Sequence, residues 1–183
     1  MAKRLDRILV IDVEATCWQE APPFGQESEI IEIGIASLDV ATMQVISKEQ
    51  IFVKPEKSAV SRFCEVLTGI TQEILDSKGA AFWQACKTLR ESHASRSRTW
   101  ASYGDYDRMI FQQQCQSRGV EYPFGSTHIN VKNLFALARG LSHEVSMPQA
   151  LQIAGLELEG THHRGVDDAY NTAKLLAQLL RGE

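Results

Sequence analysis

The chain has 183 residues, of which 44% are hydrophobic and 23% are charged, and its formal net charge is −4. This length suits one domain with a proper core, so we predict a single domain over residues 1–183. The acidic balance argues against a protein that holds duplex DNA on a broad basic face. No run reaches the roughly 18 apolar residues of a transmembrane helix, and we expect no membrane contact.

The start of the chain and its cysteines point to one compartment. The first seven residues run directly into an apolar stretch and lack the features of a signal peptide. The four cysteines form no CxxC pair, and their spacing indicates neither a zinc site nor a disulfide framework. We therefore expect a cytoplasmic protein with free thiols.

The first part of the chain predicts three strands. Residues 7–13 form an apolar run typical of a buried strand, and a polar loop over residues 15–28 follows it. Residues 29–39 are rich in β-branched side chains and predict a second strand, and residues 44–54 predict a third that Pro55 ends. The short connection between the second and third strands favours an antiparallel pair.

After Pro55 the periodicity becomes helical. Helices are expected over residues 60–67, 71–77, 79–92, 105–118, 132–139, 147–154 and 165–181, with two further strands over 98–103 and 128–132. Three leading strands followed by strands that alternate with helices predict an α/β fold. Its five-stranded mixed sheet, with the first three strands antiparallel, would be flanked by helices. This layout resembles the ribonuclease H-like fold.

Three acidic segments carry the chemistry: residues 12–14, 105–107 and 162–168. The first lies directly behind the apolar residues 8–11. Carboxylates at the end of a buried strand carry a large desolvation cost unless cations lie beside them. Oxygen ligands favour Mg²⁺ or Mn²⁺, and two such ions about 4 Å apart are a standard device for phosphodiester cleavage. The segments therefore predict a metal-dependent nuclease.

The same segments resemble the three motifs of the DEDDh family of 3′→5′ exonucleases. Residues 12–17 look like the first motif, DxE followed by a small residue and Thr. Residues 102–111 look like the second, in which an aromatic residue precedes an essential Asp. Residues 163–169 look like the third, a His and an Asp five positions apart. Three further segments look like the branch that contains the 3′-histone-mRNA exonuclease and the KapD-like proteins: residues 52–55, 63–64 and 67–71.

The resemblance implies a catalytic set of five side chains. Asp12 and Glu14 lie two positions apart on a strand, so both project to the same side. By resemblance, Asp12 would bridge two Mg²⁺ or Mn²⁺ ions, and Glu14 would hold one of them and help to orient the attacking water. Asp107 and Asp168 would complete the metal ligands. His163 would be the general base, since a free imidazole has a pKa of about 6.5.

Two of these assignments have alternatives within the same segments. Asp105 could be the acid of the second motif, or it could cap the helix that follows it. His162 and Asp167 are also five positions apart, so the third motif could be read one residue earlier. The form His-x-Gly-x-Asp-Asp favours His163 with Asp168 and leaves His162 as a flanking residue.

Substrate contacts are expected from two segments that the resemblance singles out. Backbone groups of Ala15, Thr16 and Cys17 would bind the terminal sugar. Leu67, Thr68, Gly69 and Ile70 would stack against the last bases, or they would serve only as packing between two helices. The aromatic residues Trp18 and Phe24 could add stacking surface.

The sequence therefore predicts an enzyme that hydrolyses single-stranded RNA, or as a second choice DNA, from the 3′ end to nucleoside 5′-monophosphates. A first alternative is a phosphodiesterase of the same chemistry that acts on short oligonucleotides, which the acidic charge favours. A second alternative is a non-catalytic regulatory module on the same fold. The presence of all five catalytic side chains argues against the module. A protein partner is not indicated.

Overall fold

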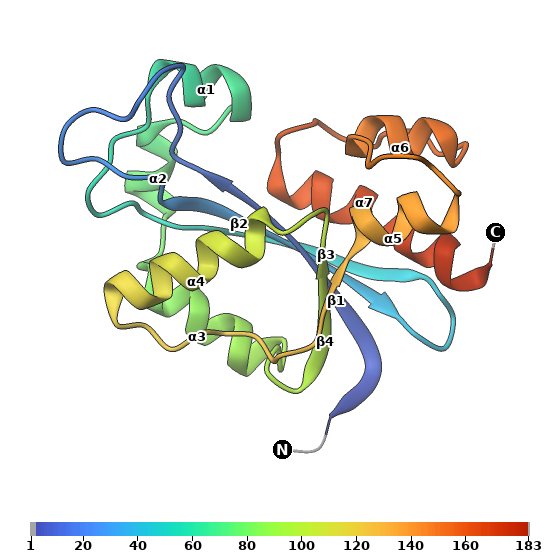
Figure 1. Ribbon diagram of the computed structural model, residues 1–183. Helices are drawn as coiled ribbons and strands as arrows, with labels where there is room; N and C mark the ends of the chain where they lie inside the picture. The colour runs from blue at the N-terminus through green and yellow to red at the C-terminus, as the bar shows by residue number, and fades with distance from the viewer. Residues whose placement is uncertain (1–2, 183) are drawn as a thin grey trace.

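The computed structural model describes residues 3–182 as an α/β structure (Figure 1). Its strands are β1 (Arg4–Ala15), β2 (Ile30–Asp39), β3 (Val45–Phe52), β4 (Arg98–Ser102) and β5 (His128–Asn130). Its helices are α1 (Arg62–Thr68), α2 (Gln72–Lys78), α3 (Phe82–Ser92), α4 (Tyr106–Arg118), α5 (Val131–Ala138), α6 (Met147–Ile153) and α7 (Gly165–Arg181). The predicted fold class is confirmed.

The five strands form one mixed sheet in the order β3-β2-β1-β4-β5. β1 pairs antiparallel with β2 and parallel with β4, and β2 and β3 are antiparallel, as predicted. The largest boundary difference is in β1, which extends beyond the predicted residues 7–13 to Arg4 and Ala15. The extension at its end arises because β1 stays paired with β2 up to Ala15, through a register shift after Glu14.

Helices cover both faces of the sheet, and the side chains of β1 alternate between the two cores. Leu9, Ile11 and Val13 pack in the core under α3 and α4, whereas Ile8 and Val10 pack in the core under α5, α6 and α7. In Figure 1 the two groups of helices lie on opposite sides of the strands. Because strand side chains alternate, Asp12 and Glu14 continue the row of Ile8 and Val10. Both acids therefore project toward the face that α7 covers.

A glycine on β2 lets α7 come close to the sheet. A Cβ atom at Gly34 would lie only 1.9 Å from the carbonyl oxygen of Gly165, the first residue of α7. Any side chain at position 34 would therefore push the start of this helix away from β1 and β2. The contact brings the first turn of α7, which carries Asp168, to the end of β1.

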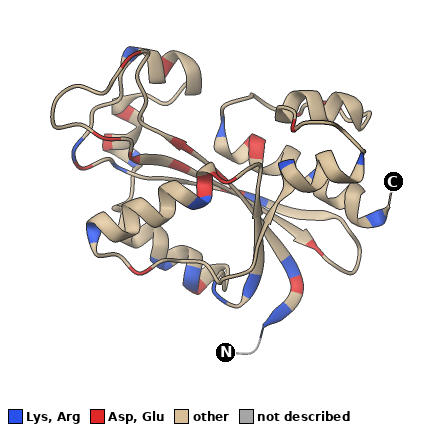
Figure 2. Cartoon of the chain, in the orientation of Figure 1, with Lys and Arg blue, Asp and Glu red and all other residues tan. Residues whose placement is uncertain are grey.

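The remaining global expectations concern thiols and membranes. All four cysteines are free, and Cys64, Cys86 and Cys115 are buried, as the sequence predicts. Among the helices of residues 3–182, none combines the length and apolar character that crossing a bilayer requires. In the view of Figure 2, Lys and Arg are spread over several elements and do not form a continuous basic stretch on the ribbon.

Candidate active site

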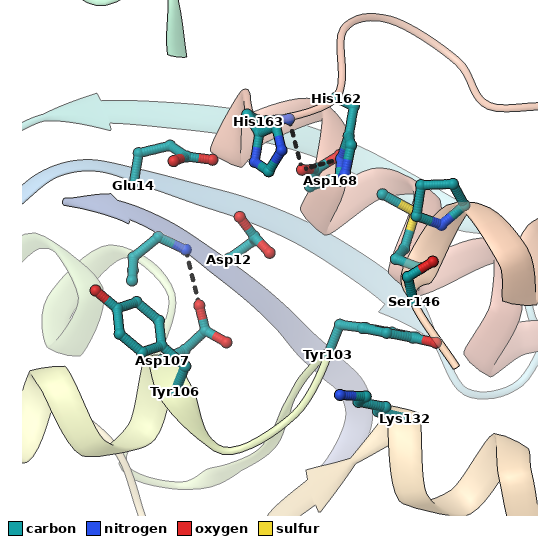
Figure 3. Close-up of a pocket in the computed structure, with 13 residues that line it drawn as sticks. Asp12, Glu14, Tyr103, Tyr106, Asp107, Lys132, Ser146, His162, His163 and Asp168 are labelled. Atoms are coloured by element: carbon teal, nitrogen blue, oxygen red, sulfur yellow. Dashed lines mark hydrogen bonds and ion pairs between the residues drawn. The ribbon is translucent and has the colours of Figure 1, made fainter. Parts of the chain in front are cut away.

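A cavity of about 350 Å³ lies where β1 ends, between the start of α4 and the loop that precedes α7. All five predicted catalytic residues line it: Asp12, Glu14, Asp107, His163 and Asp168. Figure 3 shows these side chains facing one another from three parts of the chain. The three acidic segments therefore meet at the end of β1.

The carboxylates form a compact group. Asp12, Glu14 and Asp168 each offer an oxygen, and the three oxygens lie within 4.8 Å of one another. Asp107 faces Asp12 from the first turn of α4 (Figure 3), and its Oδ1 accepts a hydrogen bond of 2.9 Å from the backbone N–H of Val13. This bond fixes the Asp107 carboxylate against the strand that carries Asp12.

Burial and mutual repulsion raise the pKa of these acids. Burial, followed by the charges of Asp107 and Asp168, holds the pKa of Asp12 well above its usual range. Burial and neighbouring carboxylates raise the pKa of Glu14 to about 8. Burial raises the pKa of Asp107 to about 7, although the N–H of Val13 acts in the opposite direction. Within the group, negative charge is therefore poorly compensated by the protein itself.

This donor set fits divalent cations. Among residues 3–182, the buried acids outside the group lie against arginines: Glu29 against Arg118 and Glu32 against Arg164. No Lys or Arg of these residues forms an ion pair with Asp12, Glu14 or Asp107, while the ion pair of Asp168 is with a histidine. Oxygen ligands that lack an internal cation are what Mg²⁺ and Mn²⁺ prefer.

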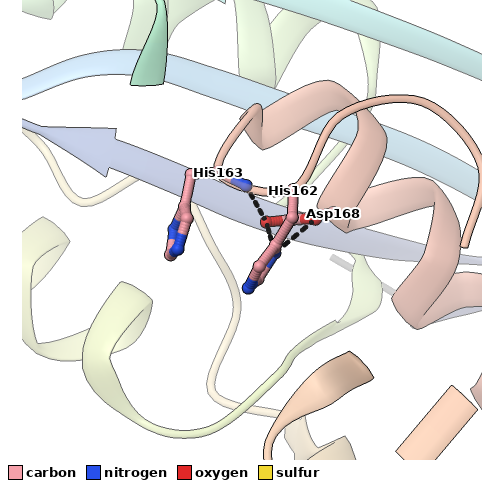
Figure 4. Close-up of side chains that lie close together, drawn as sticks. All are labelled: His162, His163 and Asp168. Carbon is pink, nitrogen blue, oxygen red and sulfur yellow. Dashed lines mark hydrogen bonds and ion pairs between the residues drawn. The ribbon is translucent and has the colours of Figure 1, made fainter. Parts of the chain in front are cut away.

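The two histidines of the third motif take different positions (Figure 4). His162 places its Nδ1 2.9 Å from Oδ2 of Asp168, and the backbone N–H of His163 donates a hydrogen bond of 2.9 Å to the same oxygen. The two rings stack with centroids 4.0 Å apart. The imidazole of His163 is left facing the cavity near Glu14 (Figure 3). His162 is therefore engaged with Asp168, and His163 is available to a substrate.

The backbone around His163 is held by an acid that the sequence analysis did not single out. Glu32 on β2 is fully buried, and its carboxylate accepts hydrogen bonds from Arg164 at 3.3 Å and from the N–H of Gly165 at 3.0 Å. His163 has a positive φ of 66°, which non-glycine residues seldom adopt. Glu32 thus fixes the two residues that follow this strained position. The sequence feature that could have identified Glu32 is its position between the apolar residues of a predicted buried strand.

Asp105, the alternative acid of the second motif, lies outside the cavity lining. It occupies the N-cap position of α4 but makes no capping hydrogen bond with its side chain. Its half-exposed carboxylate contacts Arg108 at 2.9 Å and accepts a hydrogen bond of 2.9 Å from Asn130. These contacts give Asp105 a surface role.

The seven predicted substrate-binding residues border the site without lining the cavity. Thr16, Thr68 and Ile70 are buried, and the hydroxyl of Thr16 donates to the carbonyl of Glu27 and accepts from the N–H of Glu29. The side chains of Thr16, Thr68 and Ile70 are therefore part of the packing. Ala15 is buried as well, Cys17 is half-buried, and Leu67 and Gly69 are exposed.

Helix α1 is attached to the end of β1 and presents apolar side chains to solvent. Ser61 donates a hydrogen bond to the carbonyl of Cys17, and the thiol of Cys64 contacts the carbonyl of Ala15. On the outer side of α1, Leu67 is 37% exposed, and two neighbours, Phe63 and Val66, are also exposed. Outside α1, Phe24 is fully exposed and Trp18 is half-buried.

The far wall of the cavity comes from residues that the sequence did not predict as site residues. Tyr103, Lys132 and the segment Ser146–Pro148 line it. The hydroxyl of Tyr103 donates a hydrogen bond of 2.8 Å to the carbonyl of Val145, which ties the segment before α6 to the end of β4. Tyr103 lies at the start of the second motif, whereas Lys132 and Ser146–Pro148 lie outside the three motifs, and only the tertiary structure reveals them.

Comparisons with known proteins agree with this geometry. A family model described as Exonuclease (RNase_T) matches residues 9–176. The 3′-5′ exoribonuclease 1 of Rattus norvegicus is 32% identical over 189 residues, which cover 96% of this chain and 53% of the relative. The 3′-5′ exonuclease Snipper of Drosophila melanogaster is 27% identical, with 95% of this chain and 69% of the relative covered. The chain thus spans about half the length of the rat relative.

Solved structures show the same fold. The nuclease domain of 3′hExo, a DEDDh family member bound to rAMP, superimposes with a TM-score of 0.83 at 28% identity, covering 99% of this chain and 94% of that domain. E. coli exonuclease I in complex with a dT13 oligonucleotide gives a TM-score of 0.70 at 13% identity over 95% of this chain and 41% of that one, a likeness of fold alone. The chain therefore belongs to the exonuclease family, with the ribonuclease H-like fold of its DEDDh members.

Proposed function

We propose that this chain is a metal-dependent 3′→5′ exonuclease that hydrolyses single-stranded RNA, with DNA as a second choice, to nucleoside 5′-monophosphates. The observation that carries the proposal is the convergence of Asp12, Glu14, Asp107 and Asp168 on one cavity, beside His163. The exoribonuclease relatives and the rAMP-bound nuclease domain support RNA as substrate. The exoribonuclease relatives are longer than this chain, which covers 53% of the rat protein. The activity and the substrate of this chain are therefore a proposal.

The four carboxylates would hold two divalent cations. Exonucleases of the DEDDh type use divalent metal ions, and we propose Mg²⁺ or Mn²⁺ because the donors here are oxygens. Bound cations would activate the attacking water and neutralise charge on the scissile phosphate and the leaving oxygen. Asp12 lies between the other acids, which fits a ligand that both ions share.

His163 would take the proton from the attacking water. Burial, and then the charge of His162, lowers the pKa of His163, which favours the neutral imidazole that can accept a proton. His162 would act on Asp168 and not on the water, because its Nδ1 lies 2.9 Å from the Asp168 carboxylate. The hydrogen bond between the His163 backbone and Asp168 would hold the base and the metal ligand in one fixed geometry.

The terminal nucleotide would lie over the end of β1. Its sugar would contact the backbone of Ala15, Thr16 and Cys17, and its base would meet the surface that Leu67 and Gly69 present. Tyr106, which is 51% exposed and lines the cavity near Glu14, offers a ring for stacking. Thr68 and Ile70 would support this surface from below.

A time course on a 5′-labelled single-stranded RNA of about 20 nucleotides tests the proposal. With Mg²⁺ or Mn²⁺ we expect a ladder that shortens from the 3′ end, and with EDTA we expect intact RNA. Asp12→Ala and His163→Ala should each lower the rate by at least about a hundredfold. Asp105→Asn is the matched control, because this neighbouring acid lies outside the cavity lining, and it should retain activity.

Two results would contradict the proposal. Unchanged activity in Asp12→Ala would remove the metal site from the reaction. Cleavage of dinucleotides combined with an intact 20-mer would favour the short-oligonucleotide phosphodiesterase instead. The cytoplasmic location and the one-domain organisation over residues 1–183 stay predictions.

A further inference from the structure

A single lysine distinguishes the far wall of the cavity from the carboxylate side. Within residues 3–182, Lys132 is the only Lys or Arg that lines this cavity. Its ammonium group lies 3.5 Å from a carboxylate oxygen of Glu144, and both side chains are partly exposed, at 35% and 41%. An exposed ion pair of this kind contributes little to stability. The pair with Glu144 therefore gives no strong structural reason for a lysine at this position.

The local backbone gives no reason for the charge either. Lys132 lies in the first turn of α5, where the helix dipole favours acids and disfavours cations. Its aliphatic stem runs past Gly104, since a Cβ at that glycine would lie 3.9 Å from Cδ of Lys132. Gly104 has a positive φ of 109°, so a side chain there would be strained. The lysine stem therefore packs beside the backbone of Gly104, and its ammonium end lines the cavity.

Lys132 lies on the opposite side of Asp12 from Glu14 and Tyr106. Figure 3 shows Glu14 and Tyr106 on one side of Asp12, and Lys132, Tyr103 and Ser146 on the other. The hydrogen bond from Tyr103 to the Val145 carbonyl builds this second side as a fixed wall. If the terminal nucleotide lies over the end of β1, the rest of the strand leaves the site toward Lys132. The first group of the departing strand that an ammonium can bind strongly is its next phosphate.

We propose that Lys132 binds the phosphodiester group immediately 5′ of the scissile one. This inference rests on the proposed function and adds a subsite to it. A substrate that carries the additional phosphate would be cleaved faster than one that lacks it. Glu144 would exchange its contact with Lys132 for water when the phosphate arrives.

Two dinucleotides that differ by one phosphate test the subsite. A dinucleotide with a 5′-hydroxyl contains only the scissile phosphodiester, whereas its 5′-phosphorylated form adds the group that Lys132 would bind. We expect the wild-type protein to cleave the phosphorylated form with a kcat/KM about tenfold higher. In Lys132→Met this ratio should fall to about one, and Lys132→Arg should keep most of it. Lys87→Met, on the exposed side of α3, is the control and should keep the wild-type ratio.

A binding measurement keeps the inference separate from the activity. With Ca²⁺ in place of Mg²⁺, the affinity for a labelled single-stranded RNA is measured by anisotropy at several salt concentrations. Loss of one phosphate contact should make the salt slope of Lys132→Met shallower by about 0.7. An unchanged dinucleotide ratio together with an unchanged slope would overturn the Lys132 subsite. If the wild-type protein cleaves no RNA, the proposed function fails, and the salt slope still decides the subsite.

Discussion

Two groups of buried acids lie near the start of β2, and they differ in what surrounds them. Glu29 is 1% exposed, and its carboxylate accepts hydrogen bonds from the backbone N–H groups of Glu56, Lys57 and Ser58 and from Arg118. Burial alone would raise the pKa of Glu29, but these donors hold it below its usual value. Asp12 is half-buried, and desolvation together with the neighbouring acids raises its pKa.

The difference separates a structural acid from a candidate ligand. Both residues are acids beside apolar strand residues, so the local sequence describes them alike. Glu29 receives its positive partner from the fold. Asp12 and its neighbours do not, and the charge that they need must come from bound cations. Glu29 is thus an acid with an arginine partner, whereas among residues 3–182 no Lys or Arg forms an ion pair with Asp12, Glu14 or Asp107, which marks these three as candidate metal ligands.

The largest expected effect is on the rate of RNA cleavage, and it should follow substitution of Asp12 but not of Glu29. Asp12→Asn should lower the rate of RNA cleavage by at least about a thousandfold, because the neutral amide is a poor ligand for a divalent cation. Glu29→Gln should keep the wild-type rate within about threefold at a temperature where it is folded. The measurement is the initial rate on a labelled RNA at saturating Mg²⁺. Equal losses in both variants would erase the distinction between the groups.

The next largest effect is on the stability of the protein, and it concerns Glu29 and its partner Arg118. Arg118→Met leaves Glu29 buried without its cation, and we expect the free energy of unfolding to fall by about 3–5 kcal/mol. Urea denaturation followed by circular dichroism measures this change. The control is Arg62→Met, since Arg62 is highly exposed and forms a surface ion pair with Glu65 at 2.9 Å. Similar stability in both variants would show that the Arg118 contacts matter little.

A pH series should sharpen the comparison. The pKa of Glu14 rises from 4.5 to about 8 and that of Asp107 from 3.8 to about 7 on folding. The folded protein thus binds more protons than the unfolded chain between these values. Without metal, stability should be greatest below about pH 4 with respect to these groups, and it should decrease as the pH rises to about 8. Thermal melts in EDTA measure this. If the melting temperature in EDTA rose between about pH 4 and pH 8 because of Glu14 and Asp107, that result would contradict their raised pKa values.

The smallest predicted effect concerns Glu32, a buried acid that is paired with Arg164 and lies beside the candidate metal ligands. Glu32→Gln should weaken the attachment of Arg164 and Gly165 and lower kcat by about tenfold, with little change in KM. The loss should arise because His163 and Asp168 are displaced from their working positions. Glu32→Asp should recover part of kcat at low temperature. Steady-state kinetics distinguish this positioning role from a general loss of folded protein, which would leave the kcat of the folded fraction unchanged.

The sequence predicted the strands and the helices because hydrophobic periodicity is a local signal, and the motif spacing singled out the acids that line the cavity. The antiparallel pairing of the first three strands was predicted, whereas the parallel pairing of β1 with β4 joins distant segments and is seen only in the structure. Glu32 and Lys132 escaped prediction for a different reason: their roles depend on which side chains lie beside them in space. Glu32 looks like an ordinary acid until Arg164 is placed next to it. Lys132 looks like a helical surface lysine until the cavity is known.

The account rests on the claim that the Asp12 group lacks an internal cation and binds an external one. Urea unfolding of the wild-type protein and of Asp12→Asn, at about pH 8 in EDTA and again in Mg²⁺, tests this claim directly. We expect the variant to be the more stable protein in EDTA, because it removes a carboxyl group whose charged form the folded protein does not compensate. In Mg²⁺ the order should reverse, with the wild type gaining about 2.7 kcal/mol at a hundredfold excess over Kd. A wild type that is more stable in EDTA, or an equal gain from Mg²⁺ in both proteins, would contradict the account.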